Sequence, residues 1–271
     1  MTSDNPTSSP SPTAASVGSG GGDGLASKET VPPSRPVSRI GLGLTPLQRD
    51  NPWPDFCYGE VEPFTLALDG NGDAGRELVV DIIREKRISL MVEIGCFLCG
   101  STLQWLRASD DLTIIGVDPW DGNWAFYIED IAAHPVMKRS VSHLSETQIA
   151  AIVANLWRHG NFCIALNNVH AYKHRFHPVR RKSPEALNYL HLRRIVPDLI
   201  YIDANKNRED LDTAFKLFPN AVLTGDDWLW PDETGVFRMQ EHVKAFAAEH
   251  GFEVRSARQT WVLARPERKR P

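Results

Sequence analysis

The sequence of 271 residues lacks several features that would define other classes of protein. No apolar run approaches the roughly 20 residues that a membrane-spanning helix needs. Four cysteines are too few to suggest a disulfide framework in a chain of this length, and a formal charge of -4 shows no bias toward nucleic acid or anionic membranes. The first residues also lack the basic and apolar parts of a secretory signal. We therefore expect a soluble, cytoplasmic protein without nucleic-acid or membrane partners.

Composition divides the chain into two parts. Residues 1–40 are dominated by Ser, Pro, Gly and Thr, so they cannot bury enough apolar surface to offset their ordering entropy and are predicted to be disordered. Residues 41–271 are predicted to form one α/β domain. Within it, the aromatic and Pro-rich residues 51–70 favour a strap packed on the domain over a substrate lid. Residues 121–174 are predicted to form a helical cap insert, with helices near 146–158 and 161–171.

Short apolar runs alternate with helix-compatible segments along the predicted domain. This alternation is typical of an α/β fold with parallel strands. The predicted strands cover residues 89–94, 112–117, 176–179, 198–203 and 221–224. Asp73 is expected to cap a helix over residues 74–86, and Gly251 to end a helix that precedes a hairpin-like pair of strands at the C-terminus.

A glycine-containing turn follows the first predicted strand. Gly95 and Gly100 permit a tight turn and a close approach of backbone to a ligand, and Ser101 stands near the start of the next helix. Asp118 ends the second strand about twenty residues later, where a carboxylate accepts hydrogen bonds from ribose hydroxyls. The pattern predicts a nucleoside site, but the G-x-G-x-x-G fingerprint of NAD and FAD sites is absent.

Two cysteines within this turn offer a competing interpretation. Cys96 and Cys99 have the C-x-x-C spacing of a thiol redox centre. That interpretation leaves Glu93 and Asp118 unexplained, so small buried cysteines that fill a turn are the favoured alternative.

Three further acids follow the later strands. Asp203 ends one strand, and Asp226 and Asp227 follow the next. Carboxylates that converge at one edge of a sheet repel one another unless they are protonated or bridged by a cation, and all-oxygen ligands select Mg²⁺, Mn²⁺ or Ca²⁺. Adjacent residues of a strand point to opposite faces, however, so Asp226 and Asp227 meet only if the chain bends there.

Four motifs resemble those of a known enzyme class. Residues 92–102 resemble the first motif of class I S-adenosylmethionine-dependent methyltransferases, and residues 116–120 (Gly-Val-Asp-Pro-Trp) resemble their second. Residues 203–207 are similar to the Asp-Ala-Asp-Lys-Asp stretch of cation-dependent O-methyltransferases of the catechol and caffeoyl-CoA type. Residues 225–230 resemble the Asp-Asn-x-Leu-Trp stretch of the same enzymes and the Gly-Asp-Asp-Tyr/Trp motif of a bacterial small-molecule methyltransferase group. The likeness extends over residues 88–264.

The resemblance implies a fold and a set of site residues. The fold is a Rossmann-like, seven-stranded, mostly parallel sheet with a C-terminal antiparallel strand pair and helices on both faces. Lys206 would be the general base. The implied metal ligands are Asp203, Asp226 and Asp227. The implied cofactor-binding residues are Glu93, Gly95, Gly100, Ser101, Asp118, Trp120, Ser183 and Asp203.

The sequence also departs from the pattern of these families. Cys99 stands where a glycine is expected, and Asn205 replaces an acid. Asp227 replaces an asparagine, and Pro184 replaces a glutamine that would contact adenine.

The expected activity is S-adenosylmethionine-dependent O-methylation of a small-molecule hydroxyl, assisted by Mg²⁺ or another divalent cation. Two alternatives remain open: a metal-independent O- or N-methyltransferase, and a nucleoside-binding or thiol-redox protein without methyl transfer. The expected partner is a small-molecule hydroxyl acceptor, and a homodimer is the candidate assembly.

Overall fold

The computed structural model describes residues 41–64, 75–134, 138 and 141–266. The chain divides into two units, residues 1–38 and 39–271, and the described residues belong to the second. The predicted disorder of residues 1–40 and the predicted helix cap at Asp73 lie outside the described residues.

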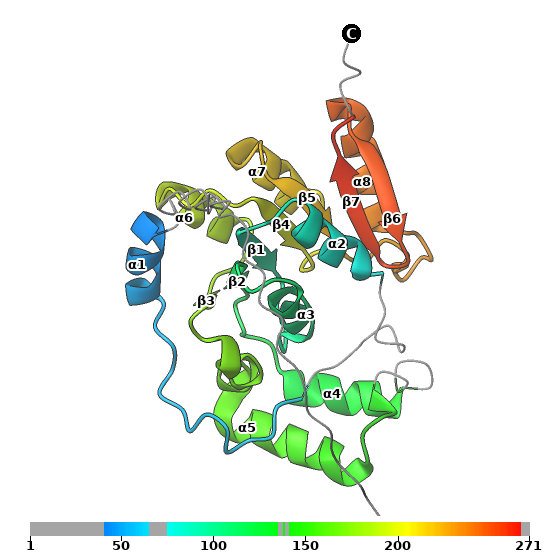
Figure 1. Cartoon of the computed structure of the whole chain (residues 1–271). Coiled ribbons are helices and arrows are strands. Elements are labelled where there is room, and N and C mark those ends of the chain that lie inside the picture. The colour runs from blue at the N-terminus through cyan, green and yellow to red at the C-terminus, as the bar shows by residue number, and fades with distance from the viewer. Residues whose placement is uncertain (1–40, 65–74, 135–137, 139–140, 267–271) are drawn as a thin grey trace, which may run out of the picture. The chain divides into compact units, whose positions relative to one another are not determined.

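A seven-stranded sheet forms the centre of the described unit (Figure 1). The strands are β1 (Leu90–Ile94), β2 (Thr113–Val117), β3 (Phe176–Val179), β4 (Leu199–Ile202), β5 (Val222–Gly225), β6 (Glu253–Ala257) and β7 (Thr260–Ala264). Their order is β3-β2-β1-β4-β5-β7-β6, with parallel pairing from β3 to β5 and antiparallel pairing of β7 with both β5 and β6. The structure thus confirms the predicted mostly parallel sheet with its C-terminal antiparallel pair.

Helices cover both faces of this sheet. They are α1 (Gly41–Asp50), α2 (Glu77–Glu85), α3 (Gly100–Ala108), α4 (Trp124–Ala133), α5 (Glu146–Asn168), the 3-10 helix η2 (His170–Tyr172), α6 (Glu185–Leu192), α7 (Glu209–Leu217) and α8 (Arg238–His250). Apolar side chains of α1, α6, α7 and α8 share a core with one face, and those of α2, α3 and the end of α5 share a core with the other. In β1, for example, Leu90 and Val92 face the first core while Met91 faces the second, as the two-residue period of a strand requires.

Helices α4 and α5 form a third apolar cluster beside the sheet, which agrees with the predicted helical insert. Gly160 interrupts α5 with φ 80° and ψ 158°, so the element consists of two helices joined at a kink, as the sequence indicated. By length and composition alone α5 is apolar enough to cross a membrane. Ile152 and Leu156 nevertheless pack in the cluster with α4, and Ile164 lies in it as well.

The chain between α1 and residue 64 is a strap fixed to α5. Two buried amides hold it: Asn167 accepts a hydrogen bond from the Gly59 N–H (2.9 Å) and donates to the Val61 carbonyl (2.7 Å). Asn168 accepts from the Phe64 N–H (3.0 Å) and donates to the Leu98 carbonyl in the turn after β1 (2.9 Å). These bonds tie the strap to α5, and Asn168 ties α5 to the turn, which favours the strap over the lid for residues 51–64. Residues 65–70 of the predicted strap lie outside the described residues.

Candidate functional site

A cavity of about 610 Å³ opens at the carboxyl ends of β1, β2 and β4. The chain leaves β1 toward β2 on one side and returns to β4 on the other, so this is the point where the strand order reverses and where open α/β sheets bind ligands. The described residues that line it are Arg76, Ile94, Gly95, Cys96, Phe97, Gly100, Ser101, Val117, Asp118, Pro119, Asp121, Gly122, Trp124, Tyr127, Arg181, Lys182, Ser183, Asp203, Ala204 and Asn205. Of the predicted cofactor-binding residues, Gly95, Gly100, Ser101, Asp118, Ser183 and Asp203 lie in this wall.

Gly95 brings the turn after β1 against the end of β4. Its φ is +87°, and a Cβ built on it would stand 1.8 Å from the carbonyl oxygen of Asp203. The N–H of Asp203 in turn donates to the carbonyl of Ile94 (2.7 Å). No side chain therefore fits at position 95, and the two strand ends form one continuous backbone surface in the cavity wall.

The turn continues into the N-terminus of α3. Cys99 adopts the left-handed conformation (φ 62°, ψ 30°) immediately before the helix, so it takes the backbone role of the glycine that the resemblance led us to expect there. Gly100 and Ser101, the first residues of α3, line the cavity. The free N–H groups and the dipole of a helix N-terminus favour a negatively charged ligand group at this end of the cavity.

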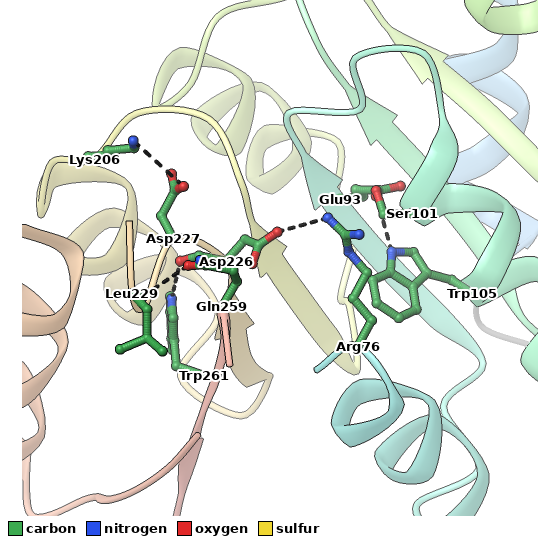
Figure 2. Close-up of polar contacts among 10 residues, drawn as sticks. All are labelled: Arg76, Glu93, Ser101, Trp105, Lys206, Asp226, Asp227, Leu229, Gln259 and Trp261. Carbon is green, nitrogen blue, oxygen red and sulfur yellow. Dashed lines mark hydrogen bonds and ion pairs between the residues drawn. The ribbon is translucent and has the colours of Figure 1, made fainter. Parts of the chain in front are cut away.

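Glu93 lies behind this wall and is fully buried. Its carboxylate accepts hydrogen bonds from Ser101 Oγ (2.6 Å), Thr102 Oγ1 (2.6 Å) and Trp105 Nε1 (3.1 Å). Figure 2 shows Glu93 between Ser101 and Trp105. Glu93 is not among the described residues that line the cavity, and the three hydrogen bonds of its carboxylate all go to α3. It acts on the site by holding the N-terminus of α3 to β1.

Burial raises the pKa of Glu93 from its ordinary value of 4.5 to about 7, against the three hydrogen bonds, which lower it. Between these two values the folded protein binds more protons than the unfolded chain. The Glu93 contribution to the free energy of unfolding therefore falls as the pH rises from 4.5 to 7, by roughly 3 kcal/mol at most. In urea titrations at pH 5 and pH 8, Glu93→Gln is expected to lose this part of the pH dependence. An unchanged pH dependence in the variant would contradict the assignment.

Asp118 is the buried acid at the end of β2. Its Oδ2 accepts from the N–H of Phe97 (2.9 Å), and its Oδ1 accepts from the N–H of Trp120 (2.7 Å). Burial raises the pKa of Asp118, while these backbone donors lower it. Each carboxylate oxygen can accept further hydrogen bonds, so the predicted ribose-binding group is fixed in place at the cavity wall.

Trp120 was expected to contact the cofactor, but the structure places it elsewhere. It is buried, with its indole N–H donating to the Phe97 carbonyl (2.9 Å) and its ring 5.0 Å from that of Phe162. Among the described residues, the cavity wall includes Pro119 and Asp121 but not Trp120. Trp120 therefore supports the two cavity loops from behind.

Ser183 lies in the part of the wall that follows β3. Its Oγ is buried and lies beside the carboxyl group of Asp210, whose pKa is raised by burial and lowered by a hydrogen bond with Ser183. The two cations beside it are paired with other groups: Lys182 Nζ lies 3.0 Å from Asp121, and Arg181 lies 2.7 Å from Glu185.

Aromatic side chains of the cap insert form one wall of the cavity, and they were not among the predicted site residues. Trp124 and Tyr127 of α4 line the cavity together with Phe97, whose ring lies 4.3 Å from Trp124 and 5.8 Å from Tyr127. The concentration of aromatic residues at the start of the insert was the available indication. Helix α4 of the predicted insert therefore forms part of the cavity wall.

The three predicted metal ligands do not point toward one common position. Asp226 Oδ2 lies 2.9 Å from Arg76 Nη2, whereas Asp227 Oδ1 lies 3.7 Å from Lys206 Nζ. Figure 2 shows the two carboxylates directed away from each other, one toward Arg76 and one toward Lys206. Asp227 has a positive φ of 64°, so the chain does bend, but the bend separates the two side chains.

The donor set does not fit the expected metal centre. Among the described residues, no three His, Cys, Asp or Glu side chains come together in a group that could hold a metal ion. Asp203 lines the cavity, but Asp226 is already paired with Arg76. We assign no chemical step to a metal.

Lys206 lies beside the cavity rather than in its described wall, to which the preceding Asn205 belongs. Its ammonium is held between Asp227 and the ring of Trp230, 4.7 Å from the ring centroid. Burial raises the pKa of Asp227 to about 6, and the neighbouring Lys206 opposes that rise.

The two cysteines of the turn are free thiols and fully buried. Burial raises the pKa of both Cys96 and Cys99 well above the ordinary value, with Glu93 nearby raising it further. Because the thiolate is the reactive form, these surroundings disfavour the thiol-redox alternative.

No protein-family model matches the chain, and no curated protein matches it. Among solved structures, the chain is similar to an O-methyltransferase from Bacillus cereus in complex with SAH, with 16% sequence identity, a TM-score of 0.43, and coverage of 82% of this chain and 89% of that one. It is also similar to the SAH-bound methyltransferase PaMTH1 from Podospora anserina, with 16% identity, a TM-score of 0.42, and coverage of 71% and 78%. These likenesses concern the fold.

Proposed function

We propose that the protein is an S-adenosylmethionine-dependent methyltransferase that methylates a hydroxyl group of a small molecule. The observation that carries the proposal is the cavity at the strand-order reversal, where three features of the wall match three parts of one ligand. The N-terminus of α3 favours the carboxylate of the ligand, and the backbone at Gly95 allows the aliphatic part of the ligand to approach closely. Asp118 can accept hydrogen bonds from the ribose hydroxyls. A volume of about 610 Å³ lies within the range of cofactor sites.

Two lining acids, Asp118 and Asp203, suit a positively charged sulfonium. Among the described residues, the lining cations Arg76, Arg181 and Lys182 each form an ion pair with an acid other than Asp118 and Asp203. Burial raises the pKa of Asp203 well above its ordinary value, and Asp226 and Asp227 raise it further. A cationic ligand at this position would favour the ionised form.

Methyl transfer from sulfur to oxygen is an in-line displacement, so positioning supplies much of the rate. S-adenosylmethionine, when bound, supplies the methyl group. The chain's own residues orient the cofactor at Gly95 and Asp118, and the aromatic side chains of Trp124 and Tyr127 exclude water on the acceptor side. Their flat apolar surface also suits an aromatic or otherwise apolar acceptor.

Calorimetric titration of the full chain tests the proposal. S-adenosylmethionine and S-adenosylhomocysteine are expected to bind with one site per chain, and NAD is expected not to bind. Mass spectrometry of a hydroxyl-compound library incubated with S-adenosylmethionine is expected to show a gain of one methyl group on at least one acceptor. Binding of NAD in preference to both sulfur nucleosides would overturn the assignment, and methyl gain on amines alone would favour the N-methyltransferase alternative.

We further propose Lys206 as the general base: its ammonium first loses a proton to solvent, and the neutral amine then accepts the hydroxyl proton. Lys206→Ala is expected to lower kcat by roughly 100-fold or more, because general-base catalysis contributes that much. Lys206→Arg keeps the positive charge beside Asp227 and Trp230, but a guanidinium does not give up its proton in proteins. The arginine variant is therefore expected to be as impaired as the alanine variant. If Lys206→Arg retains wild-type kcat, Lys206 supplies only charge and is not the base.

A further inference from the structure

Arg76 lies deep within the group of acids at the ends of β4 and β5. Arg76 immediately precedes α2, and its Nη2 lies 2.9 Å from Asp226 Oδ2. In this ion pair the Arg76 side chain is 15% exposed and the Asp226 side chain is 9% exposed. Arg76 also lines the cavity, as does Asp203. Figure 2 shows the guanidinium directed toward Asp226 from the side of the sheet that carries α2.

The acids around this guanidinium come from neighbouring strands. Asp203 and Asp226 follow Ile202 and Gly225, which are directly paired in the β4–β5 register. Burial lowers the pKa of Arg76, but Tyr201, Asp226 and Asp203 together raise it well above its ordinary value. Arg76 therefore pairs with Asp226 and offsets part of the charge of Asp203, and a guanidinium stays charged at any physiological pH.

Tyr201 belongs to the same buried group. Hydrogen bonding with Tyr201 raises the pKa of Arg76 and lowers that of Asp226, and the backbone of Asp227 lowers the pKa of Asp226 as well. Donors from Arg76, Tyr201 and Asp227 thus converge on the Asp226 carboxylate. An oxygen ligand set of this kind would suit a hard divalent cation if the guanidinium were not there.

We propose that Arg76 takes the place of a divalent cation in this site. The guanidinium pairs with Asp226 and offsets part of the charge of Asp203, and it lines the cavity, where its N–H groups favour the anionic form of an acceptor oxygen. The wild-type protein accordingly binds no divalent metal at these acids. The catalytic part of this inference rests on the proposed methyl transfer, whereas the metal-binding part does not.

Removal of Arg76 would leave Asp203 and Asp226 as uncompensated buried carboxylates, which is costly unless a new cation enters. Arg76→Ala is therefore expected to create a metal site. Mn²⁺ binding, followed by electron paramagnetic resonance of the free ion, measures this without any methyl transfer. We expect no specific binding to the wild type and an affinity at least about 100-fold higher for Arg76→Ala, since two additional free acids are the usual basis of such sites.

Two further variants serve as controls. Arg76→Ala/Asp226→Asn removes one of the freed ligands and is expected to lose the Mn²⁺ site. Arg208→Ala frees Asp212 of α7 and Glu249 of α8, which form an exposed ion-pair group with Arg208, and is expected to create no site. Should Arg76→Ala fail to fold, Arg76→Gln replaces it, because the amide keeps a donor for Asp226.

Mn²⁺ binding by the wild type that Asp226→Asn abolishes would overturn the inference, as would a folded Arg76→Ala or Arg76→Gln that binds no Mn²⁺. Mn²⁺ binding confined to the Arg76 variants supports the inference even if no methyl acceptor is found. Where methyl transfer is measured, wild-type activity is expected to be unaffected by EDTA, and loss of activity in EDTA would also overturn the inference.

Discussion

Replacement of Gly95 by alanine is expected to raise the dissociation constant for S-adenosylmethionine by roughly 100-fold or more, because even a 1 Å misplacement in a site has effects of that size. The new Cβ would stand 1.8 Å from the Asp203 carbonyl oxygen, and that neighbour is backbone, so the ends of β1 and β4 must separate. Calorimetric titration measures the affinity. The free energy of unfolding should also fall, which chemical denaturation measures.

Gly59 provides a matched control for backbone strain. Its φ of +89° is nearly that of Gly95, but a Cβ there meets no atom within 4 Å. Gly59→Ala is expected to cost only about 1 kcal/mol of stability from the unfavourable φ and to leave the affinity unchanged. Equal effects of the two substitutions would show that the contact between Gly95 and Asp203 has no special role in the cavity.

Replacement of Asp118 by asparagine is the second change with a large expected effect. The side chain holds the N–H groups of Phe97 and Trp120, and an amide can accept from only one of them while its NH₂ group opposes the other. The variant also loses the charge-assisted bonds proposed to the ribose hydroxyls. We expect the dissociation constants for S-adenosylmethionine and S-adenosylhomocysteine to rise together, by roughly 10- to 100-fold.

Asp121→Asn is the corresponding control. Asp121 also lines the cavity, but it is exposed and paired with Lys182 at 3.0 Å. Exposed ion pairs contribute little, so this variant is expected to stay within about threefold of the wild-type affinity. If Asp121→Asn weakens binding as much as Asp118→Asn does, the ribose is bound at a different position from the one proposed.

Local sequence patterns predicted the strands and several helices of the fold closely, but they did not predict α1 or α6. The strand predicted at residues 176–179 is β3 with the same bounds, and the two helices predicted on either side of Gly160 are the two halves of α5. These predictions succeeded because apolar periodicity and glycine positions are properties of adjacent residues. The cavity residues Gly95, Ser101 and Asp118 were predictable for the same reason, since strand ends of a parallel sheet meet at one edge.

Side-chain direction was less predictable. Asp226 and Asp227 were expected to face one cation, but the left-handed backbone at Asp227 directs them to different partners. Arg76 was missed altogether, because its ion pair with Asp226 spans 150 positions of the sequence and no local pattern marks it. Glu93 and Trp120 were predicted to contact the cofactor, but both lie behind the cavity wall. A strand or turn pattern does not show which neighbour a buried polar side chain will form a hydrogen bond with.

The location of bound S-adenosylhomocysteine in a crystal of the full chain tests the central claim most directly. We expect the nucleoside to lie at the reversal of strand order, with its ribose hydroxyls on Asp118 and its carboxylate at the first residues of α3. Density for the ligand at any other place on the protein, or crystals soaked at saturating concentration with this cavity unchanged, would contradict it.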